Sequence, residues 1–208
     1  MEFEQELNEV LPVDLPNREA LVQKGAAHLA LIVEANRHFN LTRITSPREA
    51  AVKHVLDSVA PWRLFAGARH ILDAGTGAGF PGIPLALVLP ETRFTLAESI
   101  RKKARFVEGA LAVLGLPNVT IAAQRAEDLL NGVDIITARA LAPVSRALDL
   151  FAPALKRGVK ILLYKGPDAA KEIEESAASA RRLRVEMKVV LTYDLPEGMG
   201  TRTIVQVG

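Results

Sequence analysis

Four glycines lie close together at Gly75, Gly77, Gly79 and Gly82, directly after an apolar run that ends at Asp73. Inside a strand or a helix such a run lowers stability, because glycine has no side chain to pack and the most backbone freedom to lose. At the end of a strand, glycines adopt positive φ angles and let a ligand approach the backbone without meeting a Cβ atom. Ligands of open parallel sheets bind beyond the carboxyl ends of the strands, so this loop is the predicted cofactor site.

Two classes of cofactor bind to a loop of this kind. The dinucleotide fingerprint is G-x-G-x-x-G, with a pyrophosphate at a helix N-terminus; here the spacing is G-x-G-x-G, and the third glycine position falls on Phe80. S-adenosylmethionine has no phosphate, and its sulfonium and ammonium groups suit a nearby carboxylate such as Asp73. The alternative for Asp73 is a structural acid that accepts hydrogen bonds from loop amides. The pattern favours a methyl donor over a dinucleotide.

Glu98 ends the next predicted strand, at the spacing at which nucleotide-binding folds carry an acid for the ribose. A carboxylate has two acceptor oxygens and can bind both ribose hydroxyls. The alternative is an ordinary solvated strand end. The spacing favours the ribose role.

Strands and helices alternate from residue 69 onward. The predicted strands cover residues 69–75, 93–99, 118–124, 133–139, 159–166, 184–195 and 201–208, and the predicted helices cover 84–89, 100–114 and 168–183. Alternation indicates a parallel sheet with helices on both faces, and the last two strands should pair antiparallel because no helix separates them. The predicted fold class is α/β: a Rossmann-like, class I methyltransferase fold whose seven-stranded, mostly parallel sheet ends in an antiparallel hairpin.

The first 66 residues have helical spacing of apolar side chains, which predicts an N-terminal helical extension before a methyltransferase domain of residues 67–208. One helix should begin at Ser46 as its cap, with Pro47 at the first helical position and Glu49 completing a capping box.

Composition excludes several classes of protein. The chain has 208 residues, no cysteine, 49% hydrophobic residues and 24% charged ones, which argues against wholesale disorder and rules out disulfides and thiolate catalysis. No window approaches the roughly 20 apolar residues of a membrane span, and the acidic N-terminus lacks the layout of a secretory signal. We therefore expect a cytoplasmic protein. We expect no metal site, since His54 and Asp57 alone provide too few ligands.

Seven blocks carry a family resemblance: FNLTRIT (39–45), KHVLDSV (53–59), LDAGTGAGFPGIPLAL (72–87), LAESIRKKARFVE (96–108), QRAEDL (124–129), ITARAL (136–141) and LLYKG (162–166). In this order they resemble the bacterial GidB (RsmG) family of 16S ribosomal RNA guanine-N7 methyltransferases. Glu98 stands where the family more often has Asp, and Ala78 stands where proline is common.

The resemblance implies S-adenosylmethionine as methyl donor and N7 of one guanine as acceptor, position 527 in the 530 loop of 16S ribosomal RNA. It implies cofactor contacts for Gly75, Phe80, Ala126, Glu127 and Arg139. The implied partner is 16S ribosomal RNA or a small-subunit precursor, and no obligate protein partner is evident. The complete predicted cofactor set is Asp73, Gly75, Gly77, Gly79, Phe80, Glu98, Ala126, Glu127 and Arg139.

Guanine N7 has an in-plane lone pair, so no proton has to leave before it attacks a methyl group, and no general base is expected. Catalysis should be mostly positioning, with the reacting atoms about 3 Å apart. Arg139, at the end of the fourth strand, is the candidate positioning residue: it would bridge the cofactor carboxylate and the RNA, or donate to guanine O6. The alternative is a salt bridge to Asp73 or Glu127 that only shapes the loop.

Arg101, Lys102 and Lys103 crowd the first turn of a predicted helix, with Ser99 as its expected N-cap. The helix dipole disfavours cations there by roughly a few tenths of a kcal/mol each. This cost at the ligand-binding edge suggests contact with RNA phosphates, and a solvated positive face is the alternative. Further candidates for RNA binding are Lys165 and His54.

Two other function classes remain open. An NAD(P)-dependent oxidoreductase would use the same sheet, but the third glycine and an evident catalytic Tyr-x-x-x-Lys or His-Asp pair are missing. A noncatalytic RNA-binding module would keep the fold without methyl transfer.

Overall fold

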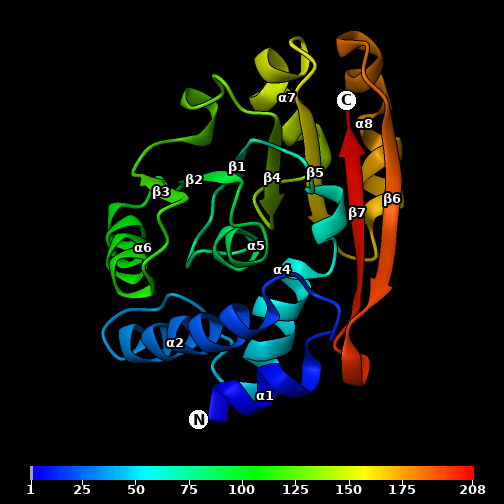
Figure 1. Ribbon diagram of the computed structural model, residues 1–208. Coiled ribbons are helices and arrows are strands. Elements are labelled where there is room, and N and C mark those ends of the chain that lie inside the picture. The colour runs from blue at the N-terminus through cyan, green and yellow to red at the C-terminus, as the bar shows by residue number, and fades with distance from the viewer. Residues whose placement is uncertain (1) are drawn as a thin grey trace.

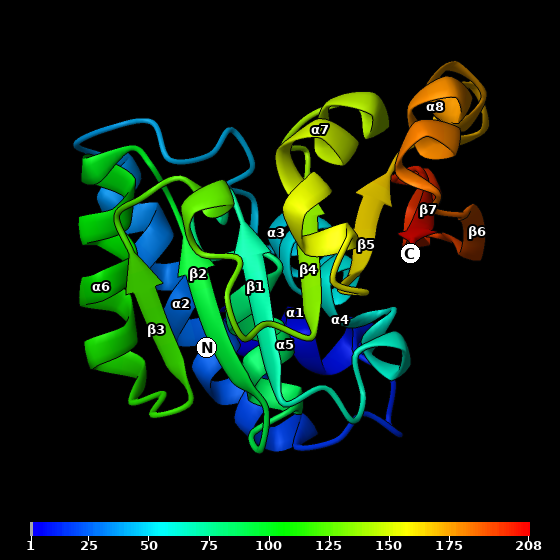
Figure 2. The same cartoon turned by 90° about the horizontal axis from the view of Figure 1, so that it is seen from above.

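One seven-stranded sheet runs through the molecule in the order β3-β2-β1-β4-β5-β7-β6 (Figures 1 and 2). The computed structural model describes residues 2–208. The strands are β1 (His70–Ala74), β2 (Arg93–Ala97), β3 (Val119–Ala122), β4 (Ile135–Arg139), β5 (Lys160–Lys165), β6 (Met187–Asp194) and β7 (Thr201–Val207). The first five strands are parallel, and β7 runs antiparallel to both β5 and β6. The predicted sheet and its closing antiparallel hairpin are confirmed, and β7 is inserted between β5 and β6.

Helices cover both faces of this sheet (Figure 2). The α-helices are α1 (Glu2–Val10), α2 (Arg18–Asn36), α3 (Pro47–Ala50), α4 (Asp57–Val59), α5 (Gly82–Val88), α6 (Arg101–Leu114), α7 (Val144–Leu155) and α8 (Ala169–Leu183). A π-helical segment, η1 (Ala51–Leu56), joins α3 to α4, and the short 3-10 helices are η2 (Trp62–Leu64), η3 (Ala126–Asp128) and η4 (Pro196–Gly198). No helix within residues 2–208 has the length and apolar composition of a membrane span.

Successive residues of the central strands belong to two separate cores. Ile71 lies in the core beneath α2 and α5, whereas Leu72 lies in the core beneath α7 and α8. The same alternation separates Leu162 from Ile161 and Leu163 on β5. Side chains of a strand point alternately to the two faces of the sheet, so each face has an apolar layer of its own.

The N-terminal helices pack against the sheet instead of standing apart from it. Leu29 and Ile32 of α2 are buried in the same core as Ile83 of α5 and Phe94 of β2, and α2 contacts both α5 and α6. The extension therefore forms one wall behind the glycine loop. The boundary at residue 66 stays a prediction.

The helix that begins after Ser46 is continuous from α3 through η1 to α4. Ser46 precedes Pro47 as predicted, but its side chain makes no capping hydrogen bond, and Glu49 pairs with Lys53 (Oε1–Nζ 2.7 Å). The predicted capping box is therefore wrong. π-Helical segments occur frequently at functional sites, and η1 carries His54 toward the carboxyl edge of the sheet.

The N-cap of α6 is Ile100, so the prediction of Ser99 is wrong. The Ile100 N–H donates to Oε1 of Glu98 (2.8 Å). This bond holds Ile100 in an extended conformation (φ −82°, ψ 102°), and the helix begins only at Arg101.

Candidate active site

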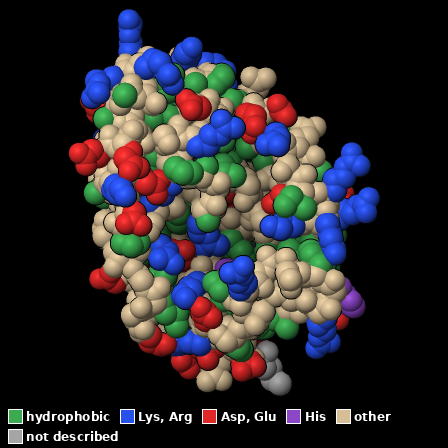
Figure 3. All heavy atoms as spheres, turned by 180° about the vertical axis from the view of Figure 1, so that it is seen from behind, with side chains coloured by type: hydrophobic (Ala, Val, Ile, Leu, Met, Phe, Trp, Pro, Cys, Tyr) green, Lys and Arg blue, Asp and Glu red, His purple; other side chains and the backbone are tan. Residues whose placement is uncertain are grey.

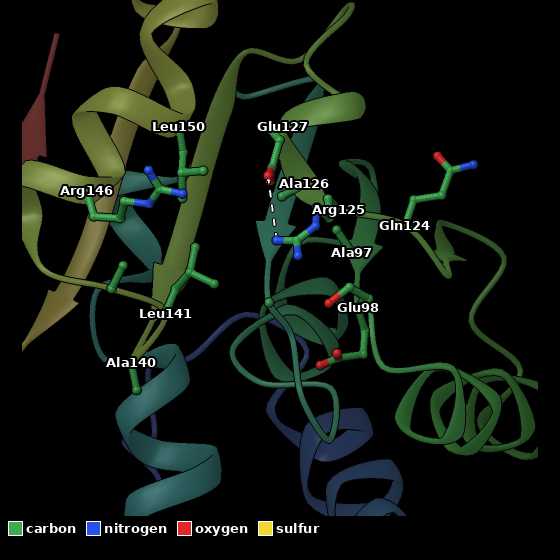
Figure 4. A pocket seen from close by; sticks show the side chains of 13 residues that line it. Ala97, Glu98, Gln124, Arg125, Ala126, Glu127, Ala140, Leu141, Arg146 and Leu150 are labelled. Carbon is green, nitrogen blue, oxygen red and sulfur yellow. Dashed lines mark ion pairs between the residues drawn. The ribbon is translucent and has the colours of Figure 1, made fainter.

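A first pocket of about 360 Å³ opens beyond the carboxyl ends of β1, β2, β3 and β4 (Figure 4). Polar side chains from η3 and from the segment before it line it together with apolar side chains that follow β4 or lie on α7. Its lining residues are Gly75, Ala97, Glu98, Ser99, Gln124, Arg125, Ala126, Glu127, Ala140, Leu141, Ala142, Arg146 and Leu150.

The glycine loop after β1 has a conformation that requires glycine. Gly75, Gly77 and Gly79 have φ angles of +70°, +61° and +103°, which other residues adopt only with strain. A Cβ atom on Gly75 would lie 2.6 Å from Cδ1 of Leu141, which also lines the first pocket, whereas a Cβ on Gly77 would meet nothing within 4 Å. The loop is therefore closely packed at Gly75 and open at Gly77.

Glu98 is held by the loop that it faces. Its side chain is buried, Oε2 accepts the Gly77 N–H (3.1 Å), and Oε1 accepts the Ile100 N–H (2.8 Å). The alternative of a solvated strand end is wrong, because water does not reach most of this residue. Each carboxylate oxygen has a further lone pair, so the position still provides acceptors to the first pocket.

Asp73 has two different oxygens. Oδ2 accepts hydrogen bonds from the Thr76 hydroxyl (2.6 Å) and from the Gly82 N–H (2.9 Å), as a structural acid would. Oδ1 is buried and has no partner within residues 2–208. Burial raises the pKa of Asp73 to about 6, although both hydrogen bonds oppose the shift. One oxygen therefore shapes the loop, and the other remains an unsatisfied acceptor.

Arg139 turns away from the first pocket and lines a second one. Its Nη1 donates to the Lys53 carbonyl (3.0 Å) and to Oδ2 of Asp57 (3.1 Å), and its guanidinium lies 5.4 Å from the Phe80 ring centroid. The alternative partners, Asp73 and Glu127, make no salt bridge with it among the described residues.

The second pocket has a volume of about 410 Å³ and lies beyond the ends of β4 and β5. The first pocket shares Ala140 with it. Ala140 has a φ of +55°, a strain of roughly 1–3 kcal/mol that typically persists at functional sites. The lining residues of the second pocket are Ile44, Lys53, His54, Asp57, Arg139, Ala140, Tyr164, Lys165, Gly166, Glu172 and Arg202.

Phe80 lies between two buried histidines behind the glycine loop. Its ring stacks on His54 (centroids 4.6 Å apart, 11° between planes) and lies 4.9 Å from His28, whose Nε2 is 2.8 Å from the Ala78 carbonyl oxygen. Burial lowers the pKa of His28 to about 4, and burial together with the charge of Arg139 lowers the pKa of His54 to about 3. Both histidines are therefore neutral at pH 7.

The predicted RNA-binding residues lie in different places. Arg101 and Lys102 are exposed on the first turn of α6, and Lys102 Nζ lies 4.2 Å from the Phe39 ring centroid. Lys165 is nearly buried in the second pocket, where it pairs with Glu172 (Nζ–Oε2 2.7 Å). Lys103 is half-buried on α6, and His54 is buried.

The structure thus brings four predicted cofactor residues, Gly75, Glu98, Ala126 and Glu127, into the lining of the first pocket. Of the remaining predicted cofactor residues, Gly77 and Gly79 belong to the loop itself without lining this pocket, and Arg139 lines the second pocket. Asp73 and Phe80 stand before and after the loop. Sequence reasoning missed several residues that follow strands, where the rule for open parallel sheets would have found them: Gln124, Arg125 and Leu141. It had no signal for others that come from distant elements: Arg146, Leu150, Tyr164, Glu172 and Arg202.

The described residues contain no group of three or more His, Asp or Glu side chains with the geometry of a metal site.

The family model and two similar proteins share one description, rRNA small subunit methyltransferase G. The GidB family, rRNA small subunit methyltransferase G, matches residues 22–197. The chain is 62% identical over 209 aligned residues to "Ribosomal RNA small subunit methyltransferase G" of Solibacter usitatus, covering 100% of both chains. It is 36% identical to the protein of that name in Carboxydothermus hydrogenoformans, covering 88% of this chain and 81% of the relative.

Solved structures share the fold at lower identity. An O-methyltransferase from Bacillus cereus in complex with SAH superposes with a TM-score of 0.58 at 21% identity, covering 87% of this chain and 90% of that one. A precorrin-6y C5,15-methyltransferase from Geobacter metallireducens gives 0.56 at 16% identity, covering 86% and 97%. These likenesses confirm the predicted class I methyltransferase fold. Taken with the match over residues 22–197, the motifs lead to one conclusion: the chain belongs to the GidB family, rRNA small subunit methyltransferase G.

Proposed function

We propose that this chain transfers the methyl group of S-adenosylmethionine to N7 of a guanine in 16S ribosomal RNA, at position 527 by resemblance. Membership in the GidB family already makes the chain a methyltransferase for RNA of the small ribosomal subunit. The observation that supports the proposal best is the pair of adjoining pockets that share Ala140. One pocket suits a nucleoside cofactor, and the other suits an acceptor base.

The residues of the first pocket fit S-adenosylmethionine. Its wall at Gly75 has no room for a Cβ atom, Glu98 presents carboxylate oxygens of the kind that bind ribose hydroxyls, and Leu141 with Leu150 provides apolar surface for a purine ring. The buried Oδ1 of Asp73 is an acceptor without a partner within residues 2–208, which suits a cationic ligand better than a pyrophosphate.

The bound donor supplies an electrophilic methyl group on a sulfonium. The chain itself has to hold the guanine in line with that group and to exclude water, since N7 carries no proton to remove. His54 is neutral at pH 7 because its pKa lies at about 3, and it therefore adds no fixed cation beside the purine that becomes positive. Arg139 is held by Asp57 and the Lys53 carbonyl, which orients it as a rigid donor in the second pocket, next to the shared Ala140.

Basic side chains suit an RNA substrate. Lys and Arg side chains gather around a hollow on the face shown in Figure 3, and the sequence pI is about 9.0. Positive surfaces attract RNA phosphates. An RNA substrate of the small ribosomal subunit or its precursor places the proposed activity in the cytoplasm.

The test uses the full-length protein, deproteinised small-subunit RNA and a labelled methyl donor. We expect label on one guanine, mapped by primer extension after cleavage at N7-methylguanine, and no label when that guanine is replaced by 7-deazaguanine. RNA binding without any transfer would instead support a noncatalytic RNA-binding module. A thermal shift with NAD but not with S-adenosylhomocysteine would support the oxidoreductase.

A further inference from the structure

We propose that Glu172, held by Lys165, is the specificity-determining residue that recognises the acceptor guanine through its N1–H and N2–H donors. The proposal rests on the proposed function, because it assigns the second pocket to the acceptor base.

Glu172 is a fixed carboxylate in the wall of the second pocket. Its Oε2 accepts the Val144 N–H (2.8 Å) and the Lys165 ammonium (2.7 Å), and its side chain is 25% exposed. Neither of these hydrogen bonds uses Oε1. Glu172 therefore has one oxygen that anchors it and a second that remains an acceptor for a ligand.

Lys165 is held as firmly as its partner. Its side chain is 10% exposed, and Nζ donates to the Ala142 carbonyl (2.7 Å) as well as to Glu172. An ammonium has three N–H donors, so one donor is left for an acceptor in the second pocket. The pair thus presents an acceptor beside a donor.

This pair matches the Watson–Crick edge of guanine. That edge has the N1–H and N2–H donors beside the O6 acceptor. Adenine presents an acceptor at N1 instead, which a carboxylate repels. Buried polar groups that lose their partners penalise the wrong base strongly.

The strand order turns N7 of a guanine bound to Glu172 toward the cofactor pocket. The sheet runs β2-β1-β4-β5 at this edge, so Glu98 and the glycine loop lie on one side of Arg139 and Lys165 lies on the other. In guanine, N7 lies on the opposite side of the ring system from N1 and N2. A base whose N1 and N2 face Glu172 therefore turns N7 toward the β1 side, where the cofactor pocket lies.

The experiment compares two synthetic RNA fragments, one with guanine and one with inosine at the modified position. Inosine lacks only the N2 amino group. We expect wild-type kcat/KM to be at least about tenfold lower on inosine, as for a hydrogen bond to a charged group. In Glu172→Gln the single amide oxygen can still accept from the Val144 N–H and Lys165, but the N–H₂ group then opposes the guanine donors. The ratio of kcat/KM on guanine to kcat/KM on inosine should then fall to about one.

Glu174→Gln is the matched control, because Glu174 is exposed on the same helix; it should keep the wild-type preference. Equal wild-type rates on guanine and inosine, or an unchanged preference in a folded Glu172→Gln, would overturn the proposal. Calorimetric binding of S-adenosylhomocysteine and the melting temperature report whether the variant is folded. If the Glu172→Gln variant does not fold, the wild-type protein alone provides the test: equal rates on the guanine and inosine RNAs would overturn the proposal.

The two proposals fail differently. If the wild-type protein labels no guanine at all, the proposed function is wrong. If it labels guanine N7 but ignores the N2 amino group, the function stands and only the role of Glu172 is wrong.

Discussion

Asp57 connects three parts of the chain through one buried carboxylate. Its side chain is 2% exposed, and it contacts Arg139 of β4 (3.1 Å), the Tyr193 hydroxyl of β6 (2.9 Å) and Nε of Arg202 on β7 (3.5 Å). A buried carboxylate requires such partners, because removing it from water is unfavourable. The consequence is that Arg139 has a structural role in addition to any role toward ligands.

Arg139→Gln should lower both stability and turnover. It removes one cation from a buried pair, so we expect a loss of about 2–4 kcal/mol in the free energy of unfolding, reduced by the remaining Tyr193 and Arg202 contacts. The double variant Arg139→Gln/Asp57→Asn should regain part of the stability but not the turnover. It removes the buried carboxylate that lost Arg139, although the partly exposed Arg202 then loses its contact with Asp57. Urea unfolding and kcat/KM measure the two effects. Recovery of turnover in the double variant would make Arg139 purely structural.

Gly77→Val should weaken binding of the methyl donor. A β-branched residue at a φ of +61° is strained by roughly 1–3 kcal/mol, and the loop would relax by moving the N–H that binds Glu98. Gly67→Val is the matched control, because Gly67 also has a positive φ (+83°) and open space around it but is exposed before β1. Calorimetry with S-adenosylhomocysteine should give a raised Kd for Gly77→Val alone. Equal affinities in both variants would contradict the role of the loop.

At the scale of elements, the first turn of α6 meets the loop that follows α2. Lys102 lies over the Phe39 ring, so the basic turn and this aromatic side chain form one surface. The turn has no acidic residue, which is unfavourable for an isolated helix. A phosphate ligand would remove that cost.

Replacing Arg101, Lys102 and Lys103 by Gln should weaken RNA binding and flatten its salt dependence. For single-stranded RNA each phosphate contact contributes about 0.7 to the slope of log K against log salt, so the slope should fall by up to about 2. Filter binding between low and moderate salt measures it. The control replaces three exposed basic residues of α8 and its C-cap, at the opposite end of the sheet: Lys171, Arg181 and Arg184. An equal change in the salt slope of RNA binding in both variants would mean that net charge, and not the position of the α6 residues, determines the effect.

At the scale of the whole molecule, the N-terminal helices and the sheet are joined by buried aromatic and imidazole rings. His28 of α2 and His54 of η1 enclose Phe80 of the glycine loop. Because both histidines are buried and neutral, the contact between extension and sheet depends on pH.

We expect stability to fall with acid. The unfolded histidines bind protons below a pKa of about 6.5, whereas the folded ones stay neutral down to about 4 for His28 and 3 for His54. Asp73 acts in the opposite direction, because its folded pKa of about 6 exceeds the unfolded value and folding takes up its proton as pH falls. Between pH 6 and 4 the unfolded chain binds two protons at these three groups and the folded chain binds one. The free energy of unfolding should therefore fall by about 1.4 kcal/mol for each unit by which the pH is lowered.

Urea unfolding between pH 4 and pH 7 checks this slope. His28→Gln can keep a donor toward the Ala78 carbonyl but cannot titrate, so the slope should fall close to zero. His38→Gln is the control, because His38 is exposed. An unchanged slope in His28→Gln would contradict the assignment.

Local pattern was enough for much of the fold. Alternation of strands and helices, glycines after β1 and an acid after β2 depend on residues close in sequence, where periodicity and backbone preference act. Of the α-helices that follow β1, α7 escaped this reasoning: it contains Pro153, which normally ends a helix, although the segment is otherwise amphipathic. The parallel sheet and its closing antiparallel hairpin followed from element types alone, whereas the structure decided the strand order, with β7 between β5 and β6.

The sequence by itself determined the methyltransferase fold, the glycine loop and the family. Only the tertiary structure decided that Arg139 pairs with Asp57, 82 residues earlier in the chain, that η1 is π-helical, and that Glu172 of α8 enters the second pocket. The physical reason is that hydrogen bonds and ion pairs between distant elements depend on how the elements pack. That packing reflects the summed burial of many side chains, which no short stretch of sequence specifies.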